Sequence, residues 1–161
     1  MSSDLRDPAH RVSPRARTLW IAEGAIVGVA LTVAAIVVVA VWLDHAWGWA
    51  IVALVALLGA LQAIGIPIWR YRVHRWEASE TAVYTQRGWW ARERRIAPMS
   101  RVQTVDLAQG PLARLFGLAT VTVTTASAAG ALRIEGLDRD VALRLVDDLT
   151  RKADLVEGDA T

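Results

Sequence analysis

The sequence predicts a pair of membrane-spanning helices joined as a hairpin, followed by a small mainly-β barrel or sandwich with one C-terminal amphipathic helix. The first observation behind this prediction is that the runs 24–43 and 46–69 contain no charged residue. The second is that polar and apolar side chains alternate over much of residues 70–135, which is the period of strands. The third is an apolar stripe at helical spacing between residues 138 and 152.

The two uncharged runs account for an unusually apolar composition. Of the 161 residues, 54% are hydrophobic, whereas soluble domains have about 45–50%. Each run reaches the length of about 20 residues that a helix needs to cross a bilayer. An ordinary soluble globular protein is therefore excluded, and the remaining residues suffice for one small domain. We divide the chain into an N-terminal tail (1–18), a transmembrane hairpin (19–69), a folded domain (70–152) and a flexible acidic tail (153–161).

Basic residues mark the orientation of the hairpin. Arginines flank both of its outer ends: Arg6, Arg11, Arg15, Arg17, Arg70, Arg72 and Arg75. The connecting loop, Asp44-His45, has no lysine or arginine. Because cytoplasmic loops carry the excess of basic residues, we expect both termini and the domain to lie in the cytoplasm. A cleavable signal peptide is the competing interpretation of the first run, but that run exceeds the usual apolar length of about 7–15 residues and a second span follows at once.

Two glycines on the first span are candidate helix-packing positions. Gly24 and Gly28 form a G-x-x-x-G pattern, and small residues four apart let helix backbones approach closely. Packing within the hairpin is the favoured interpretation, and a homodimer contact is the alternative. Glu23 and Gln62 fall at similar depth near the cytoplasmic end, where we expect a hydrogen bond between them or snorkelling to the headgroups. An ion path through Glu23, as in a small transporter or channel subunit, is a less favoured alternative.

Short strands and two helices are predicted after the hairpin. The strands are residues 71–76, 82–86, 89–96, 102–107, 119–124 and 132–135. Gly110-Pro111 opens a short helix over 111–116, which Gly117 stops. Asp138 is the predicted N-cap of a longer helix that runs to about Lys152 and packs its apolar stripe against the sheet. Antiparallel strands followed by one such helix predict a small β-barrel or orthogonal sandwich.

One stretch of the domain carries a family resemblance. Residues Gln109–Val123, QGPLARLFGLATVTV, and the preceding run Ile96–Val105 resemble the bacterial pleckstrin-homology (PH) family of membrane proteins. In that family a two-helix membrane hairpin leads into the domain, and an I-P-x-x-R-I-Q-x-V run precedes Q-G-P-L-x-R-L-x-G-L-A. Here Ala97 is inserted before the proline, and Val102 takes the isoleucine position. The resemblance covers about residues 19–152 and implies a PH-like barrel; it implies no reaction, because the family has no defined catalytic residues.

No catalytic or metal site can be assembled from the sequence. The chain has no cysteine, which excludes disulfides, thiolate metal sites and thiol nucleophiles. His10, His45 and His74 fall in the tail, the external loop and the first predicted strand, too far apart to share a metal. Neither a phosphate-cradling glycine loop nor a G-x-S-x-G nucleophile turn occurs. We therefore expect no enzyme activity, no cofactor and no metal, and the nearly balanced charges argue against nucleic-acid binding.

Arginines and tryptophans of the domain form the candidate set for binding lipid or a partner protein. Its members are Arg70, Arg72, Arg75, Arg92, Arg94, Arg95, Trp89 and Trp90. The first three follow the second span directly, where each basic residue contributes about 1 kcal/mol of attraction to anionic lipid. The alternative is that these charges only set the topology and cover a solvated strand. Glu77 and Glu80, in the first turn between strands, argue against specific headgroup binding, because PH domains typically hold headgroups there.

The leading functional hypothesis is a non-enzymatic scaffold. The hairpin would anchor a PH-like domain at the inner face of the bacterial membrane, where the domain mediates assembly with another copy or with a larger membrane protein partner. Absence of a catalytic constellation, combined with a complete tethered domain, favours this hypothesis. The first alternative is a sensor of anionic membrane lipids that acts through the arginine clusters.

Overall fold

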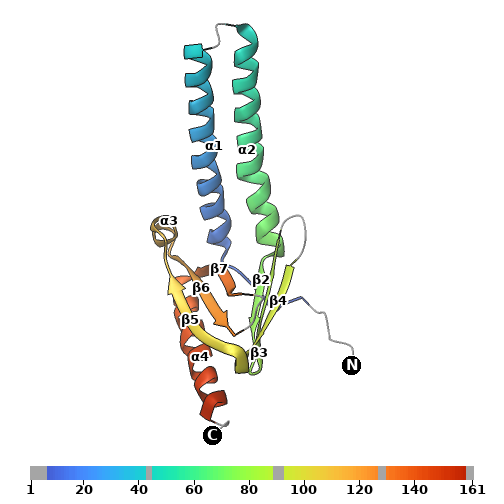
Figure 1. Cartoon of the computed structure of the whole chain (residues 1–161), viewed down its shortest axis with the longest axis vertical. Helices are drawn as coiled ribbons and strands as arrows, with labels where there is room; N and C mark the ends of the chain where they lie inside the picture. The colour runs from blue at the N-terminus through green and yellow to red at the C-terminus, as the bar shows by residue number, and fades with distance from the viewer. Residues whose placement is uncertain (1–6, 43–44, 89–92, 127–129, 159–161) are drawn as a thin grey trace. The chain divides into compact units, whose positions relative to one another are not determined.

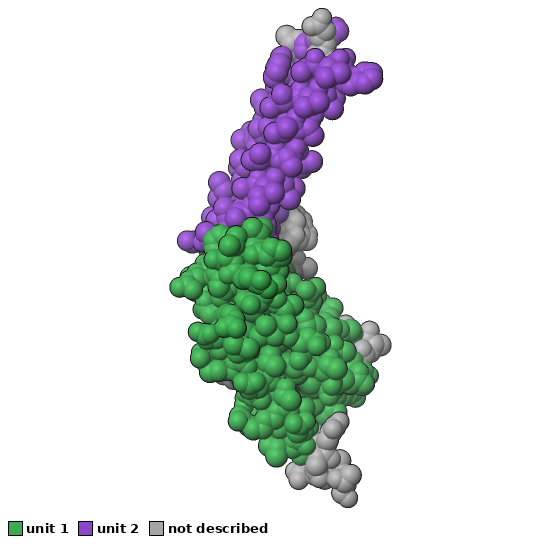
Figure 2. All heavy atoms as spheres, turned by 90° about the vertical axis from the view of Figure 1, so that its left-hand side faces the viewer, with its two compact units in different colours: residues 1–16, 70–161 green, residues 17–69 purple. Residues whose placement is uncertain are grey.

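The structure is a computed structural model that describes residues 7–42, 45–88, 93–126 and 130–158. The chain forms two compact units, which Figure 2 shows in different colours. One unit consists of residues 17–69, and the other combines residues 1–16 with residues 70–161. The first of these units is the hairpin, and the second is the domain.

Two long helices make up the hairpin. Helix α1 (Pro14–Trp42) and helix α2 (Ala46–Val73) lie side by side and run in opposite directions (Figure 1). Both are long and apolar enough to cross a membrane. Large apolar side chains are exposed along both helices, including Ile26, Val29, Leu31, Leu54, Leu57 and Leu61. Such an apolar exterior suits lipid as the solvent, and the predicted helical hairpin is confirmed.

Small residues bring the two helices together. A Cβ atom built on Gly24 would lie only 2.9 Å from the Cα atom of Ala63, and one built on Gly59 would lie 3.2 Å from the Cα atom of Gly28. Glycine at these positions lets the two backbones approach. The expected hydrogen bond between Glu23 and Gln62 is absent among the described residues, and both side chains are exposed. Gly24 and Ala63 face each other where the two helices touch. Glu23 and Gln62 each precede one of these residues and therefore point away from that contact.

The domain is a sandwich of two antiparallel sheets and a C-terminal helix. One sheet has the order β1-β2-β3-β4, and the other has the order β5-β6-β7. The strands are β1 (His10–Arg11), β2 (Arg75–Ala78), β3 (Ala82–Arg87), β4 (Glu93–Pro98), β5 (Val102–Ala108), β6 (Leu118–Thr125) and β7 (Leu132–Asp138). A short 3₁₀ turn, Met99–Arg101, joins the sheets, α3 (Pro111–Leu115) joins β5 to β6, and α4 (Arg139–Gly158) ends the fold. The predicted mainly-β sandwich with one C-terminal helix is confirmed.

The core lies between the sheets and α4. Val121, Val123 and Ile134 of the second sheet are fully buried, as the alternating pattern predicts. From α4, the stripe of Ala142, Leu145 and Leu149 packs into the same cluster. Residues of the first sheet and of the 3₁₀ turn complete it: Val83, Ala97 and Met99.

Strand ends shift by up to three residues at β4 and β7, and two further boundaries differ more from the sequence prediction. Helix α2 continues through Val73, and β2 begins at Arg75, so the first half of the predicted strand 71–76 is helical. Arginines in the last helical turn, Arg70 and Arg72, interact favourably with the negative end of the helix dipole. At the other end, α4 extends to Gly158, so residues 153–158 of the predicted flexible tail are helical. No glycine or proline interrupts the chain between α4's start and Gly158.

The N-terminal tail contributes a strand that sequence patterning did not predict. His10 and Arg11 of β1 pair with Trp76 and Arg75 of β2. The rings of His10 and Trp76 lie with their centroids 5.2 Å apart. A two-residue strand has too little alternation to be recognised in the sequence, because its partner supplies the interactions that hold it.

Both points at which the chain leaves the domain lie beside β7. The backbone N–H of Ser13, one residue before α1, donates to the carbonyl oxygen of Gly136 at 2.9 Å. The Arg70 guanidinium, in the last turns of α2, forms an ion pair with Glu135. The two connections to the hairpin therefore leave the domain from adjacent positions on one strand.

Candidate functional site

A row of polar side chains crosses the four-stranded sheet. Arg75 of β2 lies directly opposite Gln86 of β3, and Gln86 lies directly opposite Arg94 of β4. Residues opposite one another on neighbouring strands share a face of the sheet, and strands lie about 4.8 Å apart. Arg75 and Arg94, which the sequence placed in separate clusters, are therefore about 10 Å apart on one face.

Buried Gln86 holds this row in place. It is only 2% exposed, and its Nε2 donates to the carbonyl oxygen of Val73 at 3.4 Å. Its Oε1 accepts a hydrogen bond from Nε of Arg94 at 2.9 Å. Arg94 in turn donates from Nη2 to Asp7 at 2.6 Å. Arg94 is thus fixed by a buried amide and a carboxylate rather than extended into solvent.

Carboxylates also engage Arg95 and Arg87. Glu93 accepts hydrogen bonds from Nε of Arg95 at 2.5 Å and from Nε of Arg87 at 3.0 Å. These two hydrogen bonds, with the Arg95 bond the larger, lower the pKa of the Glu93 carboxyl below its ordinary value. Arg95 also donates from Nη1 to the carbonyl oxygen of Ala131 at 3.3 Å. The two described arginines of the predicted cluster, Arg94 and Arg95, are therefore each paired with a carboxylate of their own domain.

A cleft beside β4 adds an arginine that the sequence analysis did not single out. The cleft has a volume of about 240 Å³ and is lined by Arg94, Arg95, Ile96, Ala97, Pro98, Arg101, Thr125, Gly130 and Leu132. Arg101 is exposed and has no ion-pair partner in the described part of the chain. Its side chain is the cation in this cleft that is free to meet an anion. Its proximity to Arg94 depends on the chain reversal at the 3₁₀ turn, which residue spacing did not reveal.

The remaining predicted residues are dispersed. Arg70 is paired with Glu135, and Arg75 donates from Nη1 to the carbonyl oxygen of Pro8 at 3.3 Å. Arg72 is exposed at the end of α2. Three of the predicted residues fall outside the described residues: Trp89, Trp90 and Arg92. The structure therefore does not gather the five described candidates into one site.

His74 does not add a positive charge to this region. The residue is buried, only 3% exposed, directly after α2. Burial, followed by the charge of Arg70, lowers the pKa of the imidazole from 6.5 to about 4. His74 is therefore neutral at physiological pH and belongs to the folded interior.

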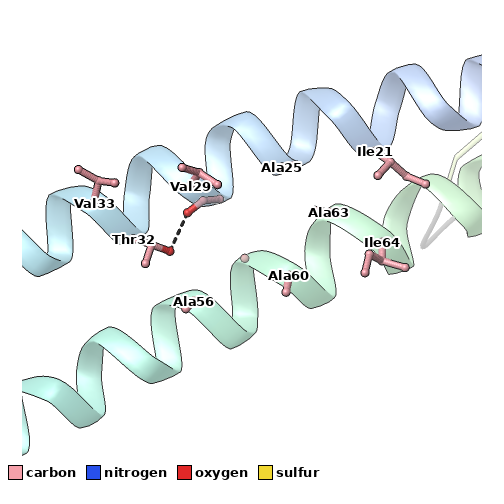
Figure 3. Close-up of a pocket in the computed structure, with 11 residues that line it drawn as sticks. Ile21, Ala25, Val29, Thr32, Val33, Ala56, Ala60, Ala63 and Ile64 are labelled. Atoms are coloured by element: carbon pink, nitrogen blue, oxygen red, sulfur yellow. Dashed lines mark hydrogen bonds between the residues drawn. The ribbon is translucent and has the colours of Figure 1, made fainter.

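An apolar groove runs along the hairpin between the two helices. Its volume is about 490 Å³, and Figure 3 shows the residues that line it. From α1 they are Ile21, Ala25, Gly28, Val29, Thr32 and Val33, and from α2 they are Ala56, Gly59, Ala60, Ala63 and Ile64. The hydroxyl of Thr32 donates to the carbonyl oxygen of Gly28 at 2.8 Å, so its polar group is satisfied within α1. Small side chains at the contact line leave this concave surface between the helices.

The comparisons with known proteins agree with this architecture. A family model described as Bacterial PH domain matches residues 18–153. The chain belongs to this family. It is also 34% identical over 156 residues to the UPF0699 transmembrane protein YdbS of Bacillus subtilis (strain 168). The aligned residues cover 94% of this chain and 97% of that protein. No solved structure matches the chain.

Membership in the bacterial PH domain family confirms the resemblance seen in the sequence. The match to residues 18–153 includes both apolar helices as well as the sandwich. In the structure the conspicuous motif that begins at Gln109 forms the turn around α3, where Nε2 of Gln109 donates to the carbonyl oxygen of Leu118 at 2.8 Å. The motif therefore shapes a bacterial PH domain. The chain is a membrane-associated PH-like protein.

Proposed function

We propose that this protein is a non-enzymatic scaffold, with its domain at the inner face of the bacterial membrane and both termini in the cytoplasm. Assembly takes place in the bilayer, where the hairpin groove receives a transmembrane helix of a second copy of the chain. The observation that carries this proposal is the apolar groove of about 490 Å³ beside the contact of Gly28 with Gly59. The arginines at the outer ends of the hairpin support the cytoplasmic orientation.

The groove has the composition that favours helix association in lipid. Lipid tails are as apolar as leucine, so association depends on close van der Waals packing, which small residues permit. Ala25, Ala56 and Ala60 keep the groove open. The outer face of α2 carries bulky side chains, Leu54, Leu57 and Leu61, that are exposed in a single copy. A second copy thus offers large side chains that fit a surface made of small ones.

Filling the groove tests the proposal. Ala25→Leu places a larger side chain in the groove, whereas Ala34→Leu makes the same change on the opposite face of α1, because nine residues correspond to about two and a half helical turns. Two full-length copies with different tags are co-expressed, extracted in a mild detergent and purified through one tag. We expect the original chain and Ala34→Leu to carry the second copy along, and Ala25→Leu to lose most of it.

Three results count against homo-assembly through the groove. The first is a strictly monomeric protein at native expression, and the second is an equal effect of Ala25→Leu and Ala34→Leu. The third is co-purification of a different membrane protein that Ala25→Leu removes while the two tagged copies never associate. That third result would keep the scaffold role but replace the second copy by another partner.

Anionic-lipid binding is the second candidate function, and the cleft at Arg101 favours it. The exposed guanidinium of Arg101 lines the same cleft as Arg94 and Arg95. A phosphate in the cleft would therefore meet one arginine without an ion-pair partner among the described residues and two that are paired with carboxylates. Native mass spectrometry of the full chain measures retained phosphatidylglycerol against phosphatidylcholine. Arg101→Gln should reduce retention of the anionic lipid, and Arg133→Gln, which removes an exposed arginine of β7 outside the cleft, should not. Equal retention in the two variants would reject the cleft as a lipid site.

A further inference from the structure

One leucine of the domain is exposed more fully than any other large apolar side chain described in that unit. Leu115, the last residue of α3, is 80% exposed. Helix α3 forms the connection from β5 to β6 (Figure 1). Folding the domain therefore leaves a large apolar side chain in water, although a polar residue at this position would cost nothing in packing. A surface that covers Leu115 would remove this apolar area from water, and the position of the turn in the domain decides which surface can do so.

A closed turn presents this leucine. The N–H of Arg114 donates to the carbonyl oxygen of Gly110 at 2.9 Å, and the N–H of Gly117 donates to that of Arg114 at 3.1 Å. Gly117 has a φ of +67°, which reverses the chain into β6. The hydrogen bond from Gln109 to Leu118 closes the base of the turn. Leu115 thus projects from a defined structure in which each of these backbone donors is paired.

The turn lies at the end of the domain from which the first connection to the hairpin leaves. Nη1 of Arg15 lies 3.6 Å from the place that a Cβ atom would take on Gly117. Gly117 also accepts a hydrogen bond from the N–H of Arg139 at 3.0 Å, which places the start of α4 there. Leu115 is two residues from Gly117, a reach of at most about 7 Å. Because the apolar part of α1 follows Arg15 within a few residues, this end of the domain is close to the bilayer.

The second connection leaves from the same end. Arg70 pairs with Glu135, and the next residue of β7, Gly136, accepts the hydrogen bond from Ser13 at 2.9 Å. Two covalent connections a few residues from apolar spans hold this end of the domain at the membrane surface, whatever the angle between domain and hairpin. This placement favours lipid as the surface that covers the α3 turn.

We propose that α3 inserts Leu115 into the interfacial region of the bilayer, with Arg114 at the level of the lipid phosphates. Burying the leucine side chain removes apolar area from water. The exposed guanidinium of Arg114 attracts anionic headgroups. The aliphatic part of the same side chain lies along the boundary of the acyl chains. Arg15, whose side chain is 68% exposed and lies 3.9 Å from the carboxylate of Asp138, is a second arginine at this end. The partner is a lipid surface, and this contact is independent of the hairpin groove and of the cleft at Arg101.

The absence of cysteine allows a direct test in the full chain. Leu115→Cys is labelled with an environment-sensitive fluorophore, and the protein is reconstituted into vesicles of phosphatidylglycerol and phosphatidylcholine with or without lipids that carry a quencher on the acyl chain. Leu155→Cys is the matched control, because Leu155 is also exposed, at 65%. It lies 16 residues after Arg139 in α4, about 24 Å along the helix axis.

We expect a blue-shifted emission at position 115 that the acyl-chain quencher reduces several-fold more than emission at position 155. Equal quenching at both positions would overturn the proposal, because it would show that the whole domain lies on the membrane. A blue shift at position 115 without acyl-chain quenching would also overturn it, and would assign the turn to a protein partner. An unshifted emission at position 115 would mean that the turn stays in water.

Discussion

Gly24 of α1 faces the backbone of Ala63 in α2 so closely that a methyl group at Gly24 would lie 2.9 Å from the Cα atom of Ala63. Four residues later on α1, a methyl group at Gly28 would meet Gly59 at an ordinary contact distance of 3.5 Å. The two glycines of the G-x-x-x-G pattern are thus unequal. Of these two positions, the closer approach to α2 is at Gly24, next to the domain in sequence.

This inequality predicts the order of three alanine substitutions. Gly24→Ala should destabilise the hairpin by about 1–3 kcal/mol, because it forces a backbone to move. Gly28→Ala should have a much smaller effect. Gly65→Ala, which has open space around it, is the matched control and should be neutral or slightly stabilising, since alanine favours helix. Unfolding of the full chain in mixed micelles with increasing denaturing detergent measures the order, and equal losses at Gly24 and Gly65 would contradict it.

The buried imidazole of His74 predicts a pH dependence of domain stability. Its pKa is lowered from 6.5 to about 4 in the folded protein, so between these values the unfolded chain binds more protons than the folded one. The free energy of unfolding should therefore fall as the pH falls, by about 1 kcal/mol between pH 7.5 and pH 5.5. Denaturant unfolding of the full chain at both pH values measures this difference.

Two histidine variants separate this effect from general acid destabilisation. His74→Gln should lower stability at pH 7.5 but remove most of the difference between pH 7.5 and pH 5.5. His10→Gln, at an exposed position of β1, should keep the difference. Stability that is flat from pH 7.5 to pH 5.5 in the original chain would show that His74 is not held neutral by burial.

The hydrogen bonds of buried Gln86 predict how much the polar row across the first sheet contributes to the free energy of unfolding. Gln86→Leu keeps a side chain of similar size but leaves the carbonyl oxygen of Val73 and the Nε of Arg94 without this amide. We expect a loss of about 1–3 kcal/mol, the usual cost of unsatisfied buried polar groups. Gln103→Leu makes the same change at an exposed position of β5 and should alter stability by less than about 0.5 kcal/mol. Chemical denaturation of the full chain compares the two, and equal stability would show that water replaces the amide.

Patterns in the sequence were sufficient for elements whose own residues determine them. The hairpin follows from two long uncharged runs. The buried face of β6 follows from the alternation of Val121 and Val123 with threonines, and that of α4 from the spacing of Leu145 and Leu149. Strand β1 and the helical end of α2 were not predicted, because tertiary partners such as Trp76 and Glu135 select them. The same reason applies to the arginines. Their charge was enough to single out Arg94 and Arg95 in the sequence. The pairing of each with a carboxylate, and the position of Arg101 in the same cleft, are set by the folded chain.

The backbone conformation of Gly117 predicts that a side chain at this position destabilises the α3 turn. Its φ of +67° lies in the left-handed region, so Gly117→Ala should destabilise the domain by about 1–2 kcal/mol. Gly110→Ala, at the other end of the same turn, is the control, because Gly110 has a φ of −69° and open space at its Cβ position. Thermal unfolding of the full chain in detergent should therefore show a lower midpoint for Gly117→Ala alone. If the two variants unfold at the same midpoint, the turn tolerates a different backbone path into β6. The backbone of the turn would then not be what holds Leu115 in its exposed position.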